Sequence, residues 1–156
     1  MKIASLTLVV KNGKVLLGEK HAKAEIGGKT LNAPGGKCDG EESPLQSAVR
    51  ETQEEVGITL RPENLEKIAV INFYFSGVPA FEVHVFLTSE FEGEPVVTKE
   101  MIPAWFDVSN LPLERMLESD RSWFAKALAG EKFRASVYYL ERAKGFEKIE
   151  FLPADF

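Results

Sequence analysis

The sequence predicts an α/β or α+β fold in which a mixed β-sheet lies between helices. Three observations lead to this fold class. The 156 residues are 44% apolar, which suits one globular domain with a substantial core. Short apolar runs separated by turn residues recur along the chain, as expected for strands. Two stretches with helical signals interrupt these strands at separate points. Because no repeat, low-complexity tract or linker divides the chain, we expect residues 1–156 to form a single domain.

Composition and charge favour some partners and locations over others. The net charge of −5 argues against binding to a nucleic-acid duplex, but not against a single nucleotide with bound metal ions. Cys38 is the single cysteine, so we expect no internal disulfide and a reducing, cytoplasmic location. No apolar run approaches the length of a membrane span. The apolar start of the chain is interpreted as a strand rather than a signal peptide, because it ends at Lys11 without a small-residue cleavage site. We expect a monomer, with a dimer as the alternative.

The first two strands are expected at 3–10 and 14–18, around Asn12-Gly13, which favours the positive φ angles of a tight hairpin. The polar residues 19–30 indicate a loop, and residues 31–37 lead into a turn at Pro34-Gly35-Gly36. The later elements are expected to be paired strands at 65–75 and 80–88, a short strand at 101–107, a helix at 118–129, and a hairpin of 132–140 with 147–151.

The first helix is expected between Ser43 and Gly57. Ser43 is a favoured N-cap, Pro44 suits the first helical position, and Gly57 suits the position after the last turn. Spacings of three and four residues predict one buried face, formed by Leu45, Ala48, Val49, Thr52 and Val56.

Three glutamates of this helix, Glu51, Glu54 and Glu55, fall on one flank outside the predicted buried face. Residues three and four positions apart are neighbours on a helix, so the three carboxylates can converge on one ion. Without a cation these charges would repel one another, and hard oxygen ligands suit Mg²⁺ or Mn²⁺. Taken alone, however, glutamates on a helix more often form a solvated face.

The spacing of the whole acidic segment resembles the Nudix box. From the first glycine it reads Gly, five residues, Glu, seven residues, Arg-Glu, two residues, Glu-Glu, one residue, Gly-Ile. The matching residues are Gly36, Glu42, Arg50, Glu51, Glu54, Glu55, Gly57 and Ile58. Thr52 departs from the pattern, where the family usually has an aliphatic residue, and we expect only a small effect on packing.

This resemblance implies a Nudix fold, an α/β/α sandwich with a central mixed sheet, and hydrolysis of a nucleoside diphosphate linked to another group. It implies Mg²⁺, or alternatively Mn²⁺, as cofactor. The implied metal ligands are Gly36 through its carbonyl, Glu51, Glu54, Glu55 and Glu100. Arg50 is expected to orient a glutamate in the site, and either Glu55 or Glu100 would act as the base that activates water.

Outside the box the chain is similar to the MutT-type branch that hydrolyses oxidised purine nucleoside triphosphates, and most similar to its mammalian members. The segments that carry this likeness are VLLGEK at 15–20, LNAPGGK at 31–37, GVPAFEVHVF at 77–86, EMIPAWF at 100–106 and SDRSWF at 119–124. The resemblance implies a triphosphate cleaved to monophosphate and pyrophosphate, and a role in cleaning the nucleotide pool. The implied substrate-binding residues are Lys20, Asn32, Phe73, Phe81, Leu117 and Asp120.

Within this set, Asn32 and Asp120 would read the purine edge, the two phenylalanines would wall the base, and Lys20 would lie near the phosphates. Two positions depart from the mammalian pattern. Ser119 replaces the first of two adjacent acids, and Leu117 replaces an aromatic residue that stacks on the base. Selectivity for 8-oxo-dGTP is therefore a weaker expectation than nucleotide hydrolysis.

Each of these assignments has a structural alternative. Asn32 could be a turn residue, Asp120 an N-cap, and Lys20 and Glu100 solvated surface charges. Phe73 and Phe81 could belong to the core, as we expect first for Trp105 and Trp123. His84 is interpreted as a structural histidine and Cys38 as a bystander. Two functional alternatives also stay open: a Nudix hydrolase of a dinucleoside polyphosphate, nucleotide sugar or RNA end, and a nucleotide-binding module without turnover.

Overall fold

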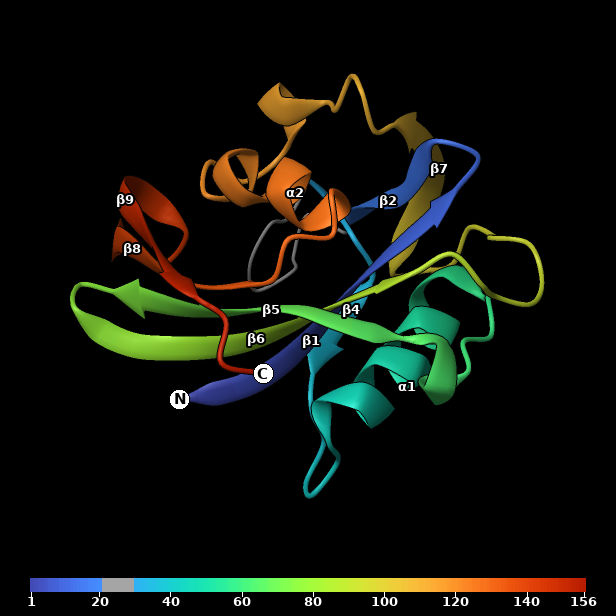
Figure 1. Ribbon diagram of the computed structural model, residues 1–156, viewed down its shortest axis with the longest axis horizontal. Coiled ribbons are helices and arrows are strands. Elements are labelled where there is room, and N and C mark those ends of the chain that lie inside the picture. The colour runs from blue at the N-terminus through green and yellow to red at the C-terminus, as the bar shows by residue number, and fades with distance from the viewer. Residues whose placement is uncertain (21–29) are drawn as a thin grey trace.

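The protein is a sandwich in which a mixed β-sheet lies between two helices, as Figure 1 shows for the computed structural model, which describes residues 1–20 and 30–156. In chain order the elements are β1 (Lys2–Lys11), β2 (Lys14–Lys20), β3 (Leu31–Asn32), β4 (Gly35–Lys37), α1 (Pro44–Val56), the 3₁₀ turn η1 (Pro62–Asn64), β5 (Glu66–Phe75), β6 (Val78–Thr88), β7 (Met101–Asp107), the 3₁₀ turn η2 (Leu113–Arg115), α2 (Asp120–Leu128), β8 (Phe133–Glu141) and β9 (Lys144–Pro153).

Within the described residues the strands form one sheet with the main order β3-β2-β1-β6-β5-β8-β9, while β4 pairs with β1 and β7 pairs with β2. The pairs β1–β6 and β5–β8 are parallel and the other pairs are antiparallel, which confirms the predicted mixed sheet. Strand β1 changes its neighbour along its length. Residues 4–6 pair with β4, and residues 10–11 pair with β2.

The two faces of the sheet bury separate cores, because successive side chains of a strand point to opposite faces. Leu8 and Leu17 belong to the core under α2, together with Trp123 and other apolar residues. Val9 and Leu16, their neighbours in sequence, belong to the core under α1. Figure 1 shows the two helices on opposite sides of the sheet, so the predicted sandwich is confirmed.

Helix α1 begins and ends as its sequence predicts. The Ser43 hydroxyl accepts a hydrogen bond from the Gln46 backbone N–H, and the Gln46 side chain accepts one from the Ser43 N–H, which completes a capping box. Gly57 ends the helix with φ of 77°. The predicted buried face is confirmed for Ala48, Thr52 and Val56, which are fully buried.

The interpretation of Gly35 and Gly36 as a turn is wrong. Residues 35–37 form strand β4, and neither glycine has a positive φ. These positions require glycine because other atoms occupy the space of a side chain. A Cβ at Gly35 would lie 2.1 Å from the Ser5 carbonyl oxygen, and a Cβ at Gly36 would lie 2.5 Å from Cδ of Glu51. Glycine here permits close contact rather than a reversal of the chain.

The other predicted elements are present with small changes. Strand β2 continues through Lys20, so the expected loop at 19–30 starts later, and residues 21–29 of that loop lie outside the described residues. Helix α2 begins at Asp120 rather than at residue 118. None of the helices in the described part of the chain is long and apolar enough to cross a membrane.

His84 is expected to be a structural histidine with its hydrogen bonds satisfied, but within the described residues its buried Nδ1 has no hydrogen-bond partner. Its Nε2 lies 2.7 Å from a carboxylate oxygen of Glu82 on the same strand. Burial lowers the pKa of His84, and the hydrogen bond to Glu82 opposes this shift. Neither residue lines the main cavity described below.

Candidate active site: one cavity with a carboxylate end and an apolar end

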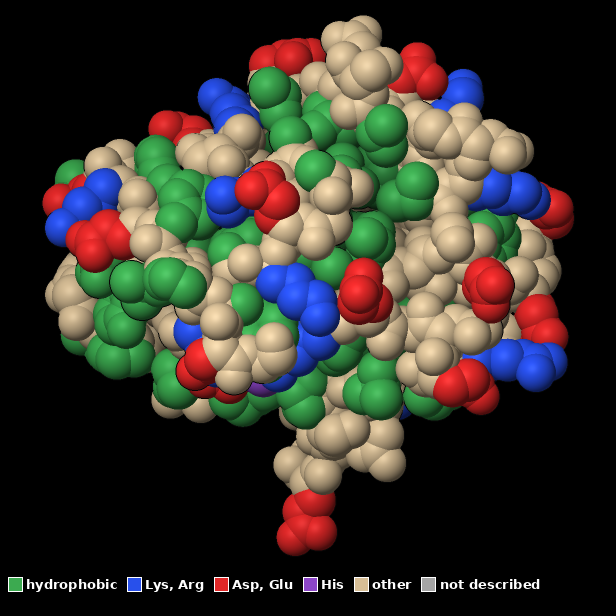
Figure 2. Space-filling view, in the orientation of Figure 1, with side chains coloured by type: hydrophobic (Ala, Val, Ile, Leu, Met, Phe, Trp, Pro, Cys, Tyr) green, Lys and Arg blue, Asp and Glu red, His purple; other side chains and the backbone are tan. Residues whose placement is uncertain are grey.

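A cavity of about 650 Å³ is lined both by predicted metal ligands and by predicted substrate-binding residues. The carboxylates of Glu51, Glu55 and Glu100 line one end. Every predicted substrate-binding residue also lines this cavity: Lys20, Asn32, Phe73, Phe81, Leu117 and Asp120. A volume of this size is typical of a small-molecule site. On the molecular face in Figure 2, basic and acidic side chains lie interspersed, unlike the basic stripe of a duplex-binding protein.

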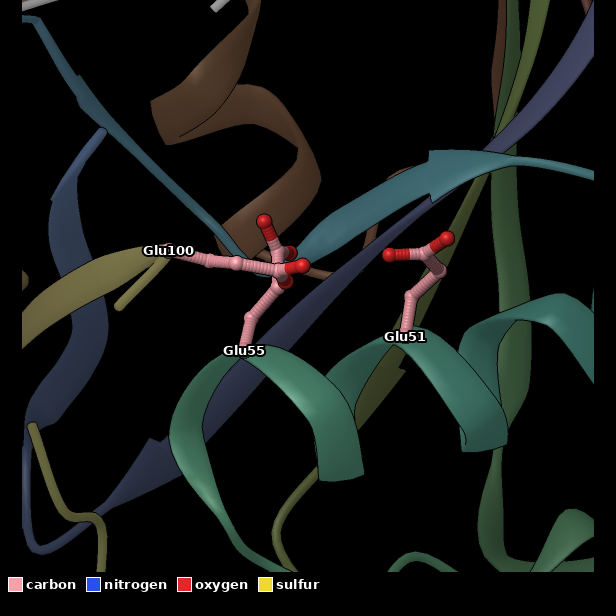
Figure 3. Close-up of side chains that lie close together, drawn as sticks. All are labelled: Glu51, Glu55 and Glu100. Atoms are coloured by element: carbon pink, nitrogen blue, oxygen red, sulfur yellow. The ribbon is translucent and has the colours of Figure 1, made fainter. Parts of the chain in front are cut away.

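Three carboxylates gather at the first end. One oxygen from each of Glu51, Glu55 and Glu100 lies within 4.8 Å of the others. Figure 3 shows that Glu51 and Glu55 project from adjacent turns of α1, while Glu100 approaches from the segment just before β7. Glu54 is outside this group and instead accepts a hydrogen bond from Arg50 at 3.1 Å. Within the described residues, the carboxylate cluster therefore joins two segments far apart in sequence.

Glu55 is the most buried member of the cluster, with 6% of its surface exposed. This corrects the expectation that it stands on an open flank of α1. Its Oε1 accepts a hydrogen bond from the Gly35 backbone N–H at 2.7 Å. Burial raises the pKa of Glu55 to about 7, against the opposing effects of Lys20 and the Gly35 N–H. Burial also raises the pKa of Glu51. Burial disfavours the charged form of these carboxylates, and a bound cation would stabilise it. The cluster is therefore suited to receive a cation.

Arg50 contacts Glu42 and Glu51, as a residue that orients a glutamate in the site would do. Its guanidinium donates two hydrogen bonds to Glu42, at 2.7 and 2.9 Å, and one to Glu51 at 2.9 Å. A further bond of 3.1 Å reaches the Lys37 carbonyl. The bond from Arg50 lowers the pKa of Glu42 to about 2. Arg50 therefore fixes the orientation of Glu51 and links α1 to the loop after β4.

The position of Glu51 also depends on β4. The Glu51 carboxyl group occupies the space where a Cβ of Gly36 would lie. The Ser47 hydroxyl donates to the Gly36 carbonyl at 3.4 Å and lies 3.0 Å from the Ser5 hydroxyl. Ser5 and Ser47 are both buried, and this pair joins α1, β1 and β4 behind the carboxylates.

The opposite end of the cavity is apolar with two buried polar residues, Asn32 and Asp120. Asn32 lies in strand β3, so the interpretation as a turn residue is wrong. Its amide nitrogen donates to the Thr30 hydroxyl at 2.8 Å, which leaves its carbonyl oxygen as an acceptor. Phe73 is half-buried and Phe81 is buried, and both line the cavity while packing in the sheet.

Asp120 is the first residue of α2, and the capping alternative for it is wrong. The N-cap residue is Ser119, and the Asp120 carboxylate instead accepts a hydrogen bond from the Trp123 indole N–H at 3.1 Å. Burial raises the pKa of Asp120 to about 7, while the Trp123 bond and the charge of Lys20 oppose the shift. The charge of Lys20 also opposes the rise in the pKa of Glu55. Lys20 thus acts electrostatically on carboxyl groups at both ends of the cavity.

Several lining residues were not predicted. They are Ala4, Ser5, Leu6, Lys37, Asp39, Ile71, Val83 and Lys99. Leu6, Ile71 and Val83 carry only the ordinary signal of strand residues, so periodicity could not separate them from the core. Trp123 is fully buried, as expected, and also contacts the cavity. Trp105 is half-buried and packs on Phe91 in the core under α1.

Comparisons with known proteins agree with this geometry. A model of the NUDIX domain matches residues 1–127. The chain is 40% identical over 133 residues to the oxidized purine nucleoside triphosphate hydrolase of Danio rerio, covering 85% of this chain and 83% of the relative. For the Mus musculus protein of the same name the identity is 34% over the same shares. The solved MutT protein of Bacillus halodurans has the same fold, with a TM-score of 0.81 and 24% identity over 99% of both chains. By the family model and these relatives, the chain belongs to the Nudix hydrolase family.

Proposed function

We propose that this protein hydrolyses a purine nucleoside triphosphate, with an oxidised base such as that of 8-oxo-dGTP, to the monophosphate and pyrophosphate in the presence of Mg²⁺. One observation carries the proposal. A single cavity presents a carboxylate cluster at one end and an apolar slot with a buried carboxylate at the other. In a nucleoside triphosphate, the phosphates would lie at the carboxylate end and the base, joined to them by the sugar, would lie in the apolar slot.

The relatives support the choice of substrate. The fish and mouse proteins are named oxidized purine nucleoside triphosphate hydrolases. An Escherichia coli protein named 8-oxo-dGTP diphosphatase is 34% identical over 85 residues, covering 54% of this chain and 63% of that protein. These names and the cavity point to the same class of substrate.

Nudix hydrolases generally use divalent metal ions, and the cluster offers the oxygen ligands that such ions prefer. Glu51, Glu55 and Glu100 would hold Mg²⁺ or Mn²⁺, with the Gly36 carbonyl and Glu54 completing the set. The bound ion would neutralise charge on the phosphates and polarise the phosphoryl group. Glu54 would join this set by exchanging its bond with Arg50, which keeps Glu42 and Glu51 as partners.

Other side chains of the cavity would bind the base and the phosphates. Phe73, Phe81 and Leu117 would enclose the base, while Asn32 and Asp120 would accept its N–H groups. Lys20 would attract the phosphates at the point where the two ends meet. Glu55, which lies in the carboxylate cluster, is one candidate for taking up a proton from the attacking water. Glu100 is the other candidate for this role.

The test is kcat/KM for 8-oxo-dGTP, 2-hydroxy-dATP, dGTP and dATP measured side by side with Mg²⁺. We expect the oxidised purines to be the better substrates. A panel in which only dinucleoside polyphosphates, nucleotide sugars or capped RNA release phosphate would contradict the proposed substrate. Binding of nucleotides without any phosphate release would favour a binding module instead.

Glu54→Gln tests the fourth glutamate. We expect lower turnover at limiting Mg²⁺, because the variant loses a charged ligand. Unchanged turnover would remove Glu54 from the proposed metal site and leave Glu51, Glu55 and Glu100. The proposal also includes a single domain over residues 1–156, a monomer, and a cytoplasmic location where free nucleotides are found.

A further inference from the structure

Of the three clustered carboxylates, Glu100 is the one that α1 does not carry. It lies in the segment just before β7, as Figure 3 shows. Glu100 is exposed, so packing in a core does not fix its position. The backbone of residues 96–101 must therefore determine where its carboxylate lies relative to Glu51 and Glu55.

This backbone is fastened to the last turn of α1 by two hydrogen bonds. The Val96 N–H donates to the Val56 carbonyl at 2.9 Å, and the Thr98 hydroxyl donates to the Glu55 carbonyl at 2.8 Å. The last four carbonyls of a helix have no partner within the helix, so both bonds satisfy groups that α1 leaves open. Glu55 therefore contributes twice. Its side chain belongs to the cluster, and its carbonyl holds the segment that carries Glu100.

The Thr98 hydroxyl also shapes the segment itself. It accepts hydrogen bonds from the backbone N–H groups of Glu100, at 3.2 Å, and Met101, at 3.3 Å. The Thr98 N–H in turn donates to the Met101 carbonyl at 3.0 Å. A hydroxyl has one donor and two acceptor sites, so the three bonds of the Thr98 side chain use its full capacity. One oxygen atom thus joins the end of α1, the backbone of Glu100 and the start of β7.

We propose that Thr98 is a positioning residue, which holds Glu100 beside Glu51 and Glu55 and so contributes to the affinity of the cluster for a divalent cation. Thr98 does not line the cavity, and its hydroxyl bonds to backbone groups, so it acts through Glu100 rather than by touching the ion. The inference rests on the proposed function, because Glu100 is taken there as a metal ligand. It concerns the ion, whereas the nucleotide panel tests the base and the reaction.

Thr98→Val tests the proposal, because valine has nearly the shape of threonine but no hydroxyl. The variant loses the bond to the Glu55 carbonyl and both bonds from the N–H groups of Glu100 and Met101. We expect the affinity for Mn²⁺, measured by calorimetry without nucleotide, to fall about tenfold, the equivalent of about 1.4 kcal/mol. Thr98→Ala also lacks the hydroxyl and should show a similar loss. Thr98→Ser keeps the hydroxyl and should retain the wild-type affinity.

Thr59→Val is the matched control. Thr59 also lies just after the C-terminal end of α1, but its hydroxyl donates to the Gln53 side chain at 2.9 Å, and it does not line the cavity. The exchange removes the same chemical group from the same end of the helix without releasing the segment before β7. The affinity for Mn²⁺ should therefore be unchanged in this variant.

A double variant separates the positioning of Glu100 from general support of the fold. If Thr98 acts through Glu100, adding Thr98→Val to Glu100→Gln should leave the Mn²⁺ affinity at the value of Glu100→Gln alone. Loss of the hydroxyl will also lower the urea midpoint of Thr98→Val, because three hydrogen bonds are removed. A purely structural role would lower that midpoint without changing the Mn²⁺ affinity.

The inference is overturned if Thr98→Val and Thr98→Ala bind Mn²⁺ as tightly as the wild type, if Thr98→Ser binds as weakly as they do, or if Thr59→Val shows the same loss. Additive effects of Thr98→Val and Glu100→Gln, or a wild type that binds no Mn²⁺, would overturn it as well. The expected affinities in a protein that hydrolyses none of the nucleotides would defeat the proposed function alone. Turnover of 8-oxo-dGTP with equal Mn²⁺ affinities in all variants would defeat the inference alone.

Discussion

The two ends of the cavity are built in different ways. At the carboxylate end, Glu51 and Glu55 lie on adjacent turns of α1, and Glu100 is the one distant contribution. At the apolar end, the lining residues come from several strands, from the segment before α2 and from α2 itself. The first end therefore depends on one rigid element, whereas the second depends on how the whole sheet packs against α2.

This difference has energetic consequences. The carboxylate end holds carboxyl groups close together, so a bound cation would stabilise it, as Arg50 does through its bond to Glu51. The apolar end is stabilised by packing and contains one isolated buried acid, Asp120. We expect substitutions at the first end to affect turnover most, and substitutions at the second to affect base choice and stability.

The largest effect is expected for Glu55→Gln. The change keeps the shape of the side chain and removes both a negative ligand and a proton acceptor. Turnover should fall by about 10²–10³-fold, the usual scale for losing a key electrostatic group. The first measurement is kcat at saturating Mg²⁺. The second is the affinity for Mn²⁺, measured by calorimetry. Glu63→Gln, an exposed glutamate outside the cavity, is the control. Wild-type kcat in Glu55→Gln would contradict a role for this residue.

The next effect is expected for Gly36→Ala. The new methyl group meets the end of the Glu51 side chain, which can move, so the fold should survive while the cluster is displaced. We expect kcat to fall by about tenfold or more, with a small change in the urea midpoint. Gly35→Ala provides the contrast, because its methyl group meets the backbone of β1 and should cost about 2–3 kcal/mol of stability. Equal stability losses in both variants would contradict this distinction.

Asp120→Asn tests the apolar end through its pH dependence. Burial raises the pKa of Asp120 to about 7 in the folded protein, from about 3.9 in the unfolded chain. The folded state therefore binds more protons between these values, and the free energy of unfolding decreases as pH rises through that window. In metal-free protein we expect Asp120→Asn to be more stable than the wild type at pH 8 by on the order of a few kcal/mol, and similar at pH 4.

The same variant should turn over 8-oxo-dGTP about tenfold more slowly, because an amide cannot ionise to present two acceptor oxygens to the base. Ser119→Ala should affect total turnover less, since Ser119 does not line the cavity. Urea unfolding from pH 4 to pH 8 in EDTA and steady-state kinetics are the measurements. Identical pH profiles of stability for Asp120→Asn and the wild type would show that Asp120 is not held as a neutral acid.

The smallest effect is expected for Leu117→Phe. Leu117 lines the apolar end and is half-buried, so an aromatic ring there can stack on a bound base. Stacking is worth about 1–3 kcal/mol per base, and part of this would be offset by tighter packing in the cavity. We expect KM for 8-oxo-dGTP to fall a few-fold while kcat is unchanged. A rise in KM would show that the cavity has no space for both rings.

The different construction of the two ends also explains which parts of the cavity could be predicted from the sequence. The α1 caps and the glutamate spacing are local signals, so the helix and most of the carboxylate end could be located from the residues alone. The strand pairing of Gly35 and Gly36 could not, because it depends on contacts with Ser5 and Glu51 that are distant in sequence. The burial of Glu55 depends in the same way on the position of β4.

At the apolar end the resemblance located the principal residues, and the structure supplied their partners. The bonds between Ser119 and Tyr139 require the start of α2 to pack against β8 of the C-terminal hairpin, whereas Asp120 and Trp123 bond to each other within α2. No periodicity in the sequence indicates such contacts. Residues such as Leu6 and Val83 carry the same pattern whether they face a solid core or a cavity.

The exchange of neighbours along β1 has a consequence for how this protein could change. Where β4 replaces β2, the sheet is lined by glycine, and carboxylates from the α1 layer reach a cavity on the α2 layer. On the proposed function, the residues for the reaction and those for base recognition would lie on opposite layers of the sheet and approach each other at β4. New base specificities can be selected on the α2 layer, by evolution or in the laboratory, without altering the catalytic helix.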